Sequence, residues 1–515
     1  MFRNIVTIGG WTFASRILGF VRDMLIAAFL GAGPVADAFF LALRLPNMFR
    51  RLFGEGAFNA AFVPAFTAAL TLDGPAKARV LAERMATLMT LWLSLLVVLG
   101  MLFMPQLMSV LTPGLVDEPF RFDLVVELSR ITFPYLLFIC LTALVSGVLN
   151  AADKFALAAG APLLFNLCAI LSLFALTPFV ATPAHALAWG TMASGVMQLA
   201  VVVWACRKAG LGFRLLSFPK LTDDTRQVLR RMVPGILGAS VTQLNLAVDM
   251  FIASWLPAGA ISYLNYADRL AQLPLGVVGA AMSTALLPVL SRQLRGGKAL
   301  SAHRSINRGV ELSLALTLPA AVALIVTAQP ILTVLFQRGE FTADKVAATA
   351  PALAAYALGL PAYVLIKSLA PGFFARGDTA TPVKIGIATV IFNLCLNLVL
   401  TPHLQHVGIA LATALSSWAN AGLLALVLSR RGHWIADRAL RRNAWRLLLA
   451  AAIMGGILYA MAELLFPLAG LWRFVALGGL VAVGLVSYFG ATLALGAFDL
   501  REFLRRRRRR SAAAA

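Results

Sequence analysis

Charged residues are scarce in this chain, and their scarcity decides its class. Only 13% of the 515 residues are Asp, Glu, Lys or Arg, whereas 60% are hydrophobic, and the mean hydropathy is +0.85. Soluble globular domains carry about 25% charged residues. The sequence also lacks any long polar block that would form a soluble domain. We therefore predict an integral membrane protein with nearly all of its mass in the bilayer.

Cysteine and histidine are too few and too scattered to indicate a disulfide framework or a metal centre. The chain has four cysteines and five histidines, and the cysteines lie in or beside apolar segments without paired spacing. The sequence shows neither a phosphate-binding loop nor a nucleophile–base set. We expect no enzymatic activity and no cofactor. The first residues show no small-residue cleavage site before Arg16, which predicts a first membrane helix rather than a removed signal peptide.

Acidic residues are the scarcer charge, with 22 Asp and Glu against 44 Lys and Arg, a net charge of +22. In a soluble protein this excess would indicate nucleic acid binding, but here the bases follow the membrane topology. They collect in the connections after the even-numbered apolar segments, so both termini are predicted to face the cytoplasm. The run Arg505–Arg510 would then lie at the inner leaflet, where anionic lipid attracts each cation by about 1 kcal/mol. We expect anionic membrane lipids, and no nucleic acid, as its partner.

Apolar stretches long enough to cross a bilayer recur from one end of the chain to the other. We predict about fourteen spans, at residues 4–31, 35–70, 85–111, 124–149, 159–180, 184–206, 232–256, 260–291, 309–328, 346–375, 382–401, 407–429, 443–466 and 472–497. The fold class is therefore an all-α polytopic membrane protein.

An internal repeat organises these spans. Residues 23–33 match residues 249–259 at an offset of 226, and Phe165–Cys168 matches Phe392–Cys395 at 227. Gly147 and Asp153 match Gly372 and Asp378 at 225. Each copy holds six spans, so both copies run the same way through the membrane, as in transporters with a central site between two lobes. The predicted divisions are an N-lobe 1–206, a basic linker 207–231, a C-lobe 232–429, a basic loop 430–442, two further spans in 443–497, and a basic tail 498–515.

Arginines within the predicted spans are the strongest functional signal. Arg16 and Arg50 fall near the middle of the first two spans, and Arg269 lies almost as deep in the eighth. Ionisable side chains at such depth are costly and normally face a cavity. Several guanidinium forks suit a phosphate or diphosphate, so we predict a cationic cavity for a phosphorylated substrate. The alternative is internal pairing, which the four-residue spacing of Arg51 and Glu55 favours for that pair.

A second polar set lies in later spans: Asp249, Asn393, Asn397 and Thr413. A carboxylate, two amides and a hydroxyl supply the hard oxygen ligands that suit Na⁺, or a proton relay. Ordinary hydrogen bonding between helices explains the same residues. Both interpretations stay open.

Five motifs together resemble the MurJ (MviN) lipid II flippases of the multidrug/oligosaccharidyl-lipid/polysaccharide (MOP) exporter superfamily. They are SRILGFVRD at 15–23, DAFF at 37–40, RLPNMFRRLFGEGAF at 44–58, YADRL at 266–270 and LAPGFFAR at 369–376. The resemblance implies a V-shaped pair of six-helix lobes, with the last two helices forming a hydrophobic groove. It also implies movement of undecaprenyl-diphosphate-linked disaccharide-pentapeptide from the inner to the outer leaflet of the bacterial inner membrane, for peptidoglycan synthesis and cell shape, by alternating access.

The same resemblance implies roles for individual residues. Its cavity arginines fall on Arg16, Arg22, Arg50 and Arg269, with Asp37, Asn47, Glu55, Ser262 and Lys367 as supporting substrate-binding positions. The sodium site of some members maps onto Asp249, Asn393, Asn397 and Thr413. Gln272 stands where some relatives have an acidic residue, so either an acid there is not general to the mechanism or another group replaces it. Na⁺, H⁺ or the membrane potential are the hypotheses for coupling.

Three alternative functions remain at this point. The chain could export another polyprenyl-linked glycan, which would use the same cationic cavity. A drug/cation antiporter is less favoured, because a cavity rich in arginine suits organic cations poorly. A scaffold could instead recruit cell-wall synthesis enzymes through the basic tail.

Overall fold

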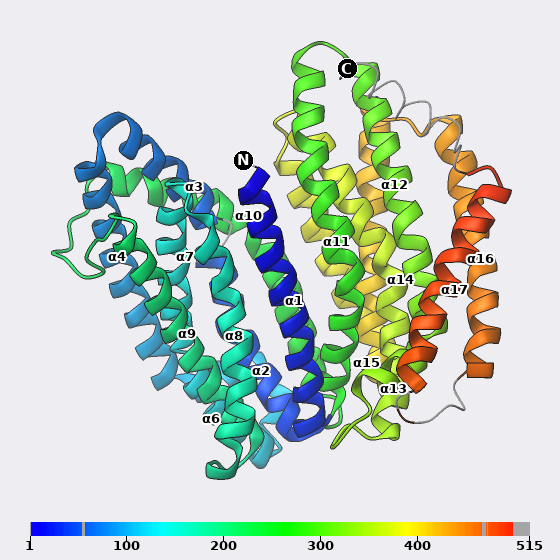
Figure 1. Cartoon of the computed structure of the whole chain (residues 1–515), viewed down its shortest axis with the longest axis horizontal. Coiled ribbons are helices and arrows are strands. Elements are labelled where there is room, and N and C mark those ends of the chain that lie inside the picture. Colours follow the sequence, from blue (N-terminus) through cyan, green and yellow to red (C-terminus); the bar gives the residue numbers. More distant parts are fainter. Residues whose placement is uncertain (1, 54–56, 466–469, 471, 498–515) are drawn as a thin grey trace. The chain divides into compact units, whose positions relative to one another are not determined.

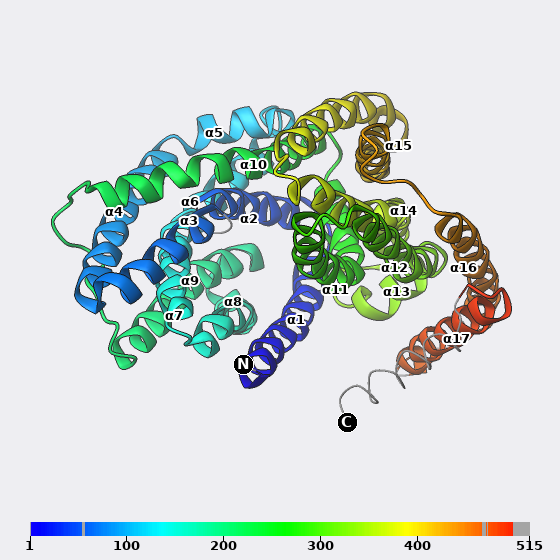
Figure 2. The ribbon, with the colours of Figure 1, turned by 90° about the horizontal axis from the view of Figure 1, so that it is seen from above.

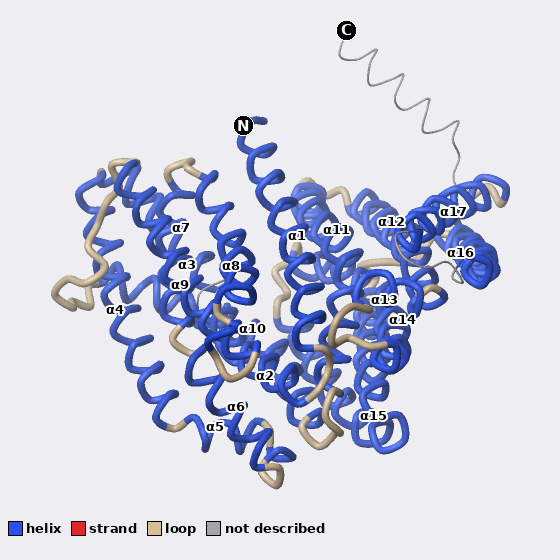
Figure 3. Tube along the Cα trace, turned by 60° about the horizontal axis from the view of Figure 1, so that its bottom comes forward, coloured by secondary structure: helices blue, strands red, loops and turns tan. Residues whose placement is uncertain are grey.

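Helices make up every regular element in the part of the chain that the structure describes (Figure 1). The computed structural model describes residues 2–53, 57–465, 470 and 472–497, and Figure 3 shows helices and connecting loops over these ranges. The predicted all-helical class is therefore confirmed. Glu55 and the Arg505–Arg510 run lie outside the described residues.

The first of two compact units comprises residues 1–262 and 338–342. Its helices are α1 (Phe2–Leu30), α2 (Pro34–Phe53), α3 (Ala57–Ala68), α4 (Pro75–Leu102), α5 (Met104–Leu111), α6 (Pro119–Thr132), α7 (Tyr135–Ala151), α8 (Phe155–Ala175), α9 (Pro183–Lys208) and α10 (Asp223–Ala253). Short turns at Ala69–Asp73, Pro113–Leu115 and Thr177–Phe179 join some of them.

The second unit comprises residues 263–337 and 343–515. Its helices are α11 (Ala260–Arg295, which starts in the first unit), α12 (Ala299–Val326), α13 (Ala328–Phe336), α14 (Ala343–Phe374), α15 (Ala380–Arg430), α16 (Arg438–Leu465) and α17 (Trp472–Ala494). The last two helices, which have no counterpart in the repeat, pack together beside α12 (Figure 2). The Tyr488 hydroxyl of α17 donates to the Ala315 carbonyl of α12 at 2.7 Å, which fixes this pair to the unit.

The chain is a multi-pass membrane protein. Among the described residues, nine helices are long and apolar enough to cross a membrane, compared with about fourteen predicted spans. Two predicted spans, 382–401 and 407–429, form the single helix α15, which bends at Gln405 (φ 50°, ψ −130°). The other four correspond to α1, α2 with α3, α10 and α11. These helices carry most of the candidate charged residues.

Aromatic side chains at helical spacing build the core of the first unit. Phe58, Phe62 and Phe66 lie on one face of α3, and the rings of Phe58 and Phe62 stack with centroids 5.1 Å apart. Residues four apart are neighbours on a helix surface. The resulting ridge packs against buried residues of α4, α7 and α9 and forms part of the hydrophobic core of this unit.

The packing boundary differs from the repeat boundary that the sequence predicts. The repeat places the start of the second copy at residue 232, but α10 packs against α3 and α2 and belongs to the first unit. Sequence duplication and compact packing are therefore separate divisions of this chain. The predicted lobes remain a statement about the repeat.

Candidate functional site

Arg22 of α1 is a buried cation held from several sides. Its Nε and Nη2 donate to Oδ1 of Asp23 at 3.0 and 2.5 Å, and its Nη1 donates to Oδ1 of Asn166 at 2.9 Å. The Phe165 ring centroid lies 5.1 Å from Cζ of Arg22, within the range of a cation–π contact. Only 7% of Arg22 is exposed. Its guanidinium therefore has one fixed direction within a predicted membrane span.

Asn166 of α8 holds the guanidinium of Arg22 in place. Its Nδ2 donates to the Ser15 carbonyl of α1 at 2.9 Å, which fixes the orientation of the amide. Its Oδ1 then points towards Arg22, further along the same helix. Gly19, between these two positions of α1, makes the close approach possible, since a Cβ there would stand 3.3 Å from Nδ2 of Asn166. The amide of Asn166 accepts this bond without adding a negative charge. Of the two acceptors, only Asp23 carries a charge opposite to that of Arg22.

Arg50 and Asn47 interact on the same face of α2. The Nε of Arg50 donates to Oδ1 of Asn47 at 3.2 Å. Pro46, one residue earlier, cannot donate to the Ala42 carbonyl four residues before it. The Thr132 hydroxyl of α6 donates to that carbonyl at 3.1 Å instead. A neighbouring helix thus satisfies the backbone group freed by the proline, which lets α2 carry a proline inside the membrane.

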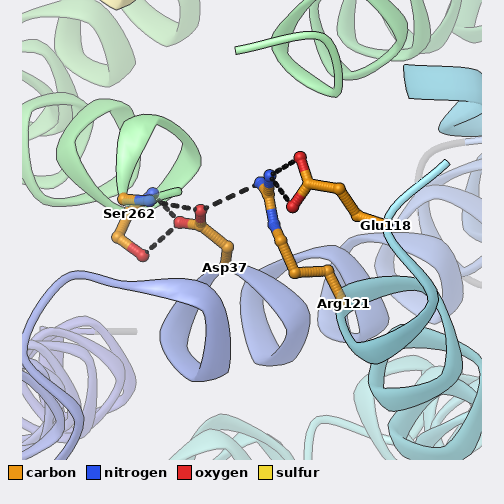
Figure 4. Close-up of polar contacts among 5 residues, drawn as sticks. Asp37, Glu118, Arg121 and Ser262 are labelled. Carbon is orange, nitrogen blue, oxygen red and sulfur yellow. Dashed lines mark hydrogen bonds and ion pairs between the residues drawn. The ribbon is translucent and has the colours of Figure 1, made fainter. Parts of the chain in front are cut away.

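Asp37, at the start of α2, binds protein groups on both carboxylate oxygens. Gly259 donates its backbone N–H to Oδ2 at 2.6 Å, and Ser262 donates its backbone N–H and hydroxyl to Oδ1 at 2.7 and 2.5 Å. Figure 4 shows Arg121 of α6 on the other side of the carboxylate, with its Nη2 3.6 Å from Oδ2. Asp37 and Ser262, both predicted to support substrate binding, therefore bind each other in this structure.

The remaining predicted cations are distributed over both units. Arg16 on α1 is exposed, and so is Arg269 on α11 in the second unit. Lys367 of α14 lies across α11, because a Cβ at Gly279 would stand only 2.8 Å from its Nζ. Each unit thus supplies cations from predicted membrane helices, and a common cavity for them stays a prediction.

The second polar set is likewise divided between the units. Asp249 is buried on α10 in the first unit, and the other three residues lie on α15 in the second. Asn397 donates through Nδ2 to Oδ1 of Asn393 at 3.4 Å, and the Thr413 hydroxyl donates to the Ile409 carbonyl at 3.0 Å. Over the described residues, no group of three or more His, Cys, Asp or Glu is arranged to hold a metal ion. The sodium site therefore remains a prediction.

Sequence reasoning did not single out Asn166 or Arg121. Asn166 appears only within the repeated FNLC motif, and conservation of an amide between two copies was the one available signal. Arg121 falls between predicted spans, where a charge needs no explanation. Its burial depends on how α6 packs on α2, which spacing along the chain does not reveal.

Buried polar clusters inside a bundle of apolar helices are typical of polytopic membrane transporters. The fold is similar to a solved inward-facing multidrug resistance MATE family transporter of the MOP superfamily, with a TM-score of 0.65 and 14% identity over 81% of this chain and 95% of that chain. This likeness concerns the fold alone. It confirms the predicted MOP-type architecture.

More specific similarities identify the family. A family model described as lipid II flippase MurJ matches residues 26–476. The chain is 42% identical over 517 residues to the probable lipid II flippase MurJ of Rhizobium tropici, covering 98% of this chain and 97% of that protein. A solved lipid II flippase MurJ in an inward closed conformation has a TM-score of 0.79 and 25% identity, over 95% of this chain and 98% of that one. The chain belongs to the MurJ family.

Proposed function

We propose that this protein translocates lipid II, the undecaprenyl-diphosphate-linked peptidoglycan precursor, from the inner to the outer leaflet of the bacterial cytoplasmic membrane. The observation that carries the proposal is the buried guanidinium of Arg22, fixed by Asp23 and Asn166 in a member of the MurJ family. Fixed guanidinium groups favour a diphosphate over a neutral or cationic ligand. The proposed activity is transport, with no covalent chemistry on the substrate.

Alternating access would use the candidate arginines in sequence. Arg16 and Arg269 are exposed, so they would meet first a headgroup that enters from water. Arg22, already directed, would complete the binding of the diphosphate once the headgroup is deeper. The polyprenyl tail would stay in lipid or follow the apolar surface of α16 and α17, whose outer faces expose Ile453, Ile457 and Leu485 among other residues.

The coupling proposal follows from the charge of the candidate site. With both termini in the cytoplasm, a membrane potential negative inside favours return of an empty cationic site towards the cytoplasm, at about 2.3 kcal/mol per charge for each 100 mV. A Na⁺ bound by Asp249, Asn393, Asn397 and Thr413 is the competing proposal. Flipping that persists after an ionophore collapses the potential would contradict the first. Flipping that is unchanged without sodium would contradict the second.

The direct test uses cells depleted of their own flippase and complemented with this protein. Lipid II exposure is scored as the fraction cleaved by an externally added lipid II-cleaving enzyme. Wild type should restore exposure, and Arg16→Ala and Arg269→Ala at equal expression should leave lipid II sequestered. If wild type fails to restore exposure while it is correctly inserted, the proposed function is wrong. If all three proteins restore it equally, the binding role of these arginines is wrong.

A further inference from the structure

Arg121 has more hydrogen-bonding capacity than the structure uses. Its side chain is 6% exposed, and its Nη1 donates to both carboxylate oxygens of Glu118, at 2.9 and 3.0 Å. Among the described residues, its Nε and Nη2 have no hydrogen-bond partner. Nη2 faces Oδ2 of Asp37 from 3.6 Å, beyond hydrogen-bond distance (Figure 4). A buried guanidinium with unused donors is costly, so its persistence needs a reason.

The connection between α10 and α11 keeps Arg121 from a closer approach to Asp37. Gly259 holds Oδ2 from 2.6 Å, so two donors compete for one oxygen and the backbone N–H is the nearer. Ser262 holds the other oxygen. All these donors belong to residues 254–262, the latch segment, which has a second anchor where Gly114 donates its N–H to the Ser254 hydroxyl at 3.1 Å.

We propose that Arg121 is a positioning residue that takes over Asp37 when the latch segment leaves it during transport. A buried carboxylate that lost its three neutral donors would be strongly destabilised without a replacement. Arg121 needs a shift of less than about 1 Å to form a charge-assisted hydrogen bond of about 2.8 Å. The exchange of partners keeps Asp37 satisfied in both states and makes release of the latch reversible. This inference rests on the proposed alternating access.

Glu118 does not account for Arg121 by itself. Its side chain is 52% exposed, so water is available to the carboxylate and a surface ion pair of this kind adds little. A residue needed only for Glu118 would also have no reason to be buried with two donors directed away from it. The position of Arg121 is explained by Asp37.

Hydrogen–deuterium exchange of the latch segment tests the direction of the effect. The amides of Gly259 and Ser262 donate to Asp37, so their exchange in the purified full-length protein reports release of the latch. Arg121→Leu should slow this exchange about ten-fold, the factor expected when a charge-assisted hydrogen bond is lost only from the released state. Arg121→Lys should exchange close to the wild-type rate. Arg130→Leu, on an exposed part of the same helix, is the matched control.

The outcomes are distinguishable. Faster exchange in Arg121→Leu would mean that Arg121 supports only the latched state, and an unchanged rate would mean that it acts on neither. Either result overturns the proposal. Because this measurement does not depend on the substrate, it stands even if the flipping assay fails.

A double-mutant cycle links the exchange to transport. In the lipid II exposure assay, Arg121→Leu should reduce the rate at least about ten-fold, as when one partner of a buried pair is removed. Removing the carboxylate as well, in Arg121→Leu with Asp37→Asn, should return the rate to that of Asp37→Asn alone. Losses that multiply instead would contradict the exchange of partners. If wild type does not restore lipid II exposure, the proposed function is contradicted. The hydrogen–deuterium exchange data alone then decide the role of Arg121.

Discussion

The two copies of the internal repeat place a buried asparagine at the same position and surround it differently. In the first copy, Asn166 accepts a hydrogen bond from Arg22, which is paired with Asp23. In the second copy, Asn393 accepts from Asn397 at 3.4 Å. The residue before Asp249, which aligns with Asp23, is Val248, and Ile170 aligns with Asn397. One scaffold position thus serves a cation in one copy and a neutral amide in the other.

This difference indicates how a duplicated transporter acquires polarity for an anion. A buried amide needs a hydrogen-bond partner. In the first copy the partner of Asn166 is Arg22, so the buried amide fixes the position of a positive charge. In the second copy the partner of Asn393 is the neutral amide of Asn397. We therefore expect the bond between Arg22 and Asn166 to contribute more to transport than the bond between Asn397 and Asn393.

Arg22→Leu should break the comparison most completely. It removes the cation that pairs with the carboxylate of Asp23, whose side chain is 14% exposed. Breaking a buried pair costs about 3–5 kcal/mol, and we expect the rate of lipid II exposure to fall by about 100-fold or more. Arg22→Lys should recover only part of the activity, because one ammonium cannot form the same fork towards Asp23 and Asn166. Wild-type rates in Arg22→Leu at equal expression would show that the fixed charge is dispensable.

Asn166→Leu and Asn393→Leu compare the two copies directly. The first leaves a buried guanidinium N–H without its acceptor, at a cost of about 1.5–3 kcal/mol, whereas the bond from Asn397 that the second removes joins two neutral amides and is worth about 0.5–1.5 kcal/mol. Lipid II exposure should therefore fall about ten-fold or more for Asn166→Leu, with a smaller loss for Asn393→Leu. Equal losses in the same assay would mean that both amides are structural, and the opposite order would move recognition to the second copy.

Gly19→Ala tests the close approach of α1 and α8 with a single methyl group. The added Cβ would stand 3.3 Å from Nδ2 of Asn166, so the amide must shift by a few tenths of an ångström. We expect a roughly two- to five-fold lower exposure rate, since small displacements of directed groups reduce binding without unfolding the protein. Gly10→Ala on the same helix is the control, because a Cβ there meets nothing within 4 Å. A larger loss for Gly10→Ala would contradict this explanation.

The sequence predicted the helical class, the repeat and the charged spans because each depends on composition or on spacing along one element. Arg22 was predicted as a cavity residue, but not its contact with Asn166, since 144 residues separate them. Arg121 was not predicted, because its burial arises where α6 packs on α2. The packing of α10 within the first unit was not predicted, because a repeat in sequence does not report contacts between helices.

Helix ends sharpen the comparison on a smaller scale. Asp153 and Asp378 align in sequence, but the equivalent positions of the two turns are Asp153 (φ 59°) and Gly377 (φ 78°), which share the left-handed conformation. In both turns the next amide donates to a carbonyl five residues earlier, from Lys154 to Leu149 and from Asp378 to Phe373.

Substitutions at this left-handed position should change the stability of the protein in opposite directions in the two turns. Gly377→Ala should destabilise the protein by about 1 kcal/mol because Cβ disfavours the conformation. Asp153→Gly should stabilise it by less than that, since aspartate tolerates the conformation better than alanine does. Thermal unfolding of the purified protein measures both shifts. A stabilising Gly377→Ala would remove the equivalence of the two turns.

The smallest expected effect concerns Asp378, which has Lys154 as its structural counterpart in the first copy. Hydrogen bonds from the Thr381 hydroxyl and backbone, and then from Arg431, lower the pKa of Asp378 from 3.8 to about 2. Because the folded pKa lies below the ordinary value, this contribution to stability is present above about pH 4 and is lost as the pH falls towards about 2. The pair with Arg431 is partly exposed, so the contribution should be below about 1 kcal/mol.

Asp378→Asn should therefore unfold at a slightly lower temperature than wild type at pH 6, and the two proteins should converge as the pH falls below about 4. Lys154→Ala is the control from the first copy, because the exposed Lys154 side chain has no carboxylate to titrate in this range. Its difference from wild type should stay constant between pH 6 and pH 3. A difference between Asp378→Asn and wild type that grows on acidification would contradict this prediction. It would mean that the folded protein stabilises the protonated form of Asp378 rather than the ionised form.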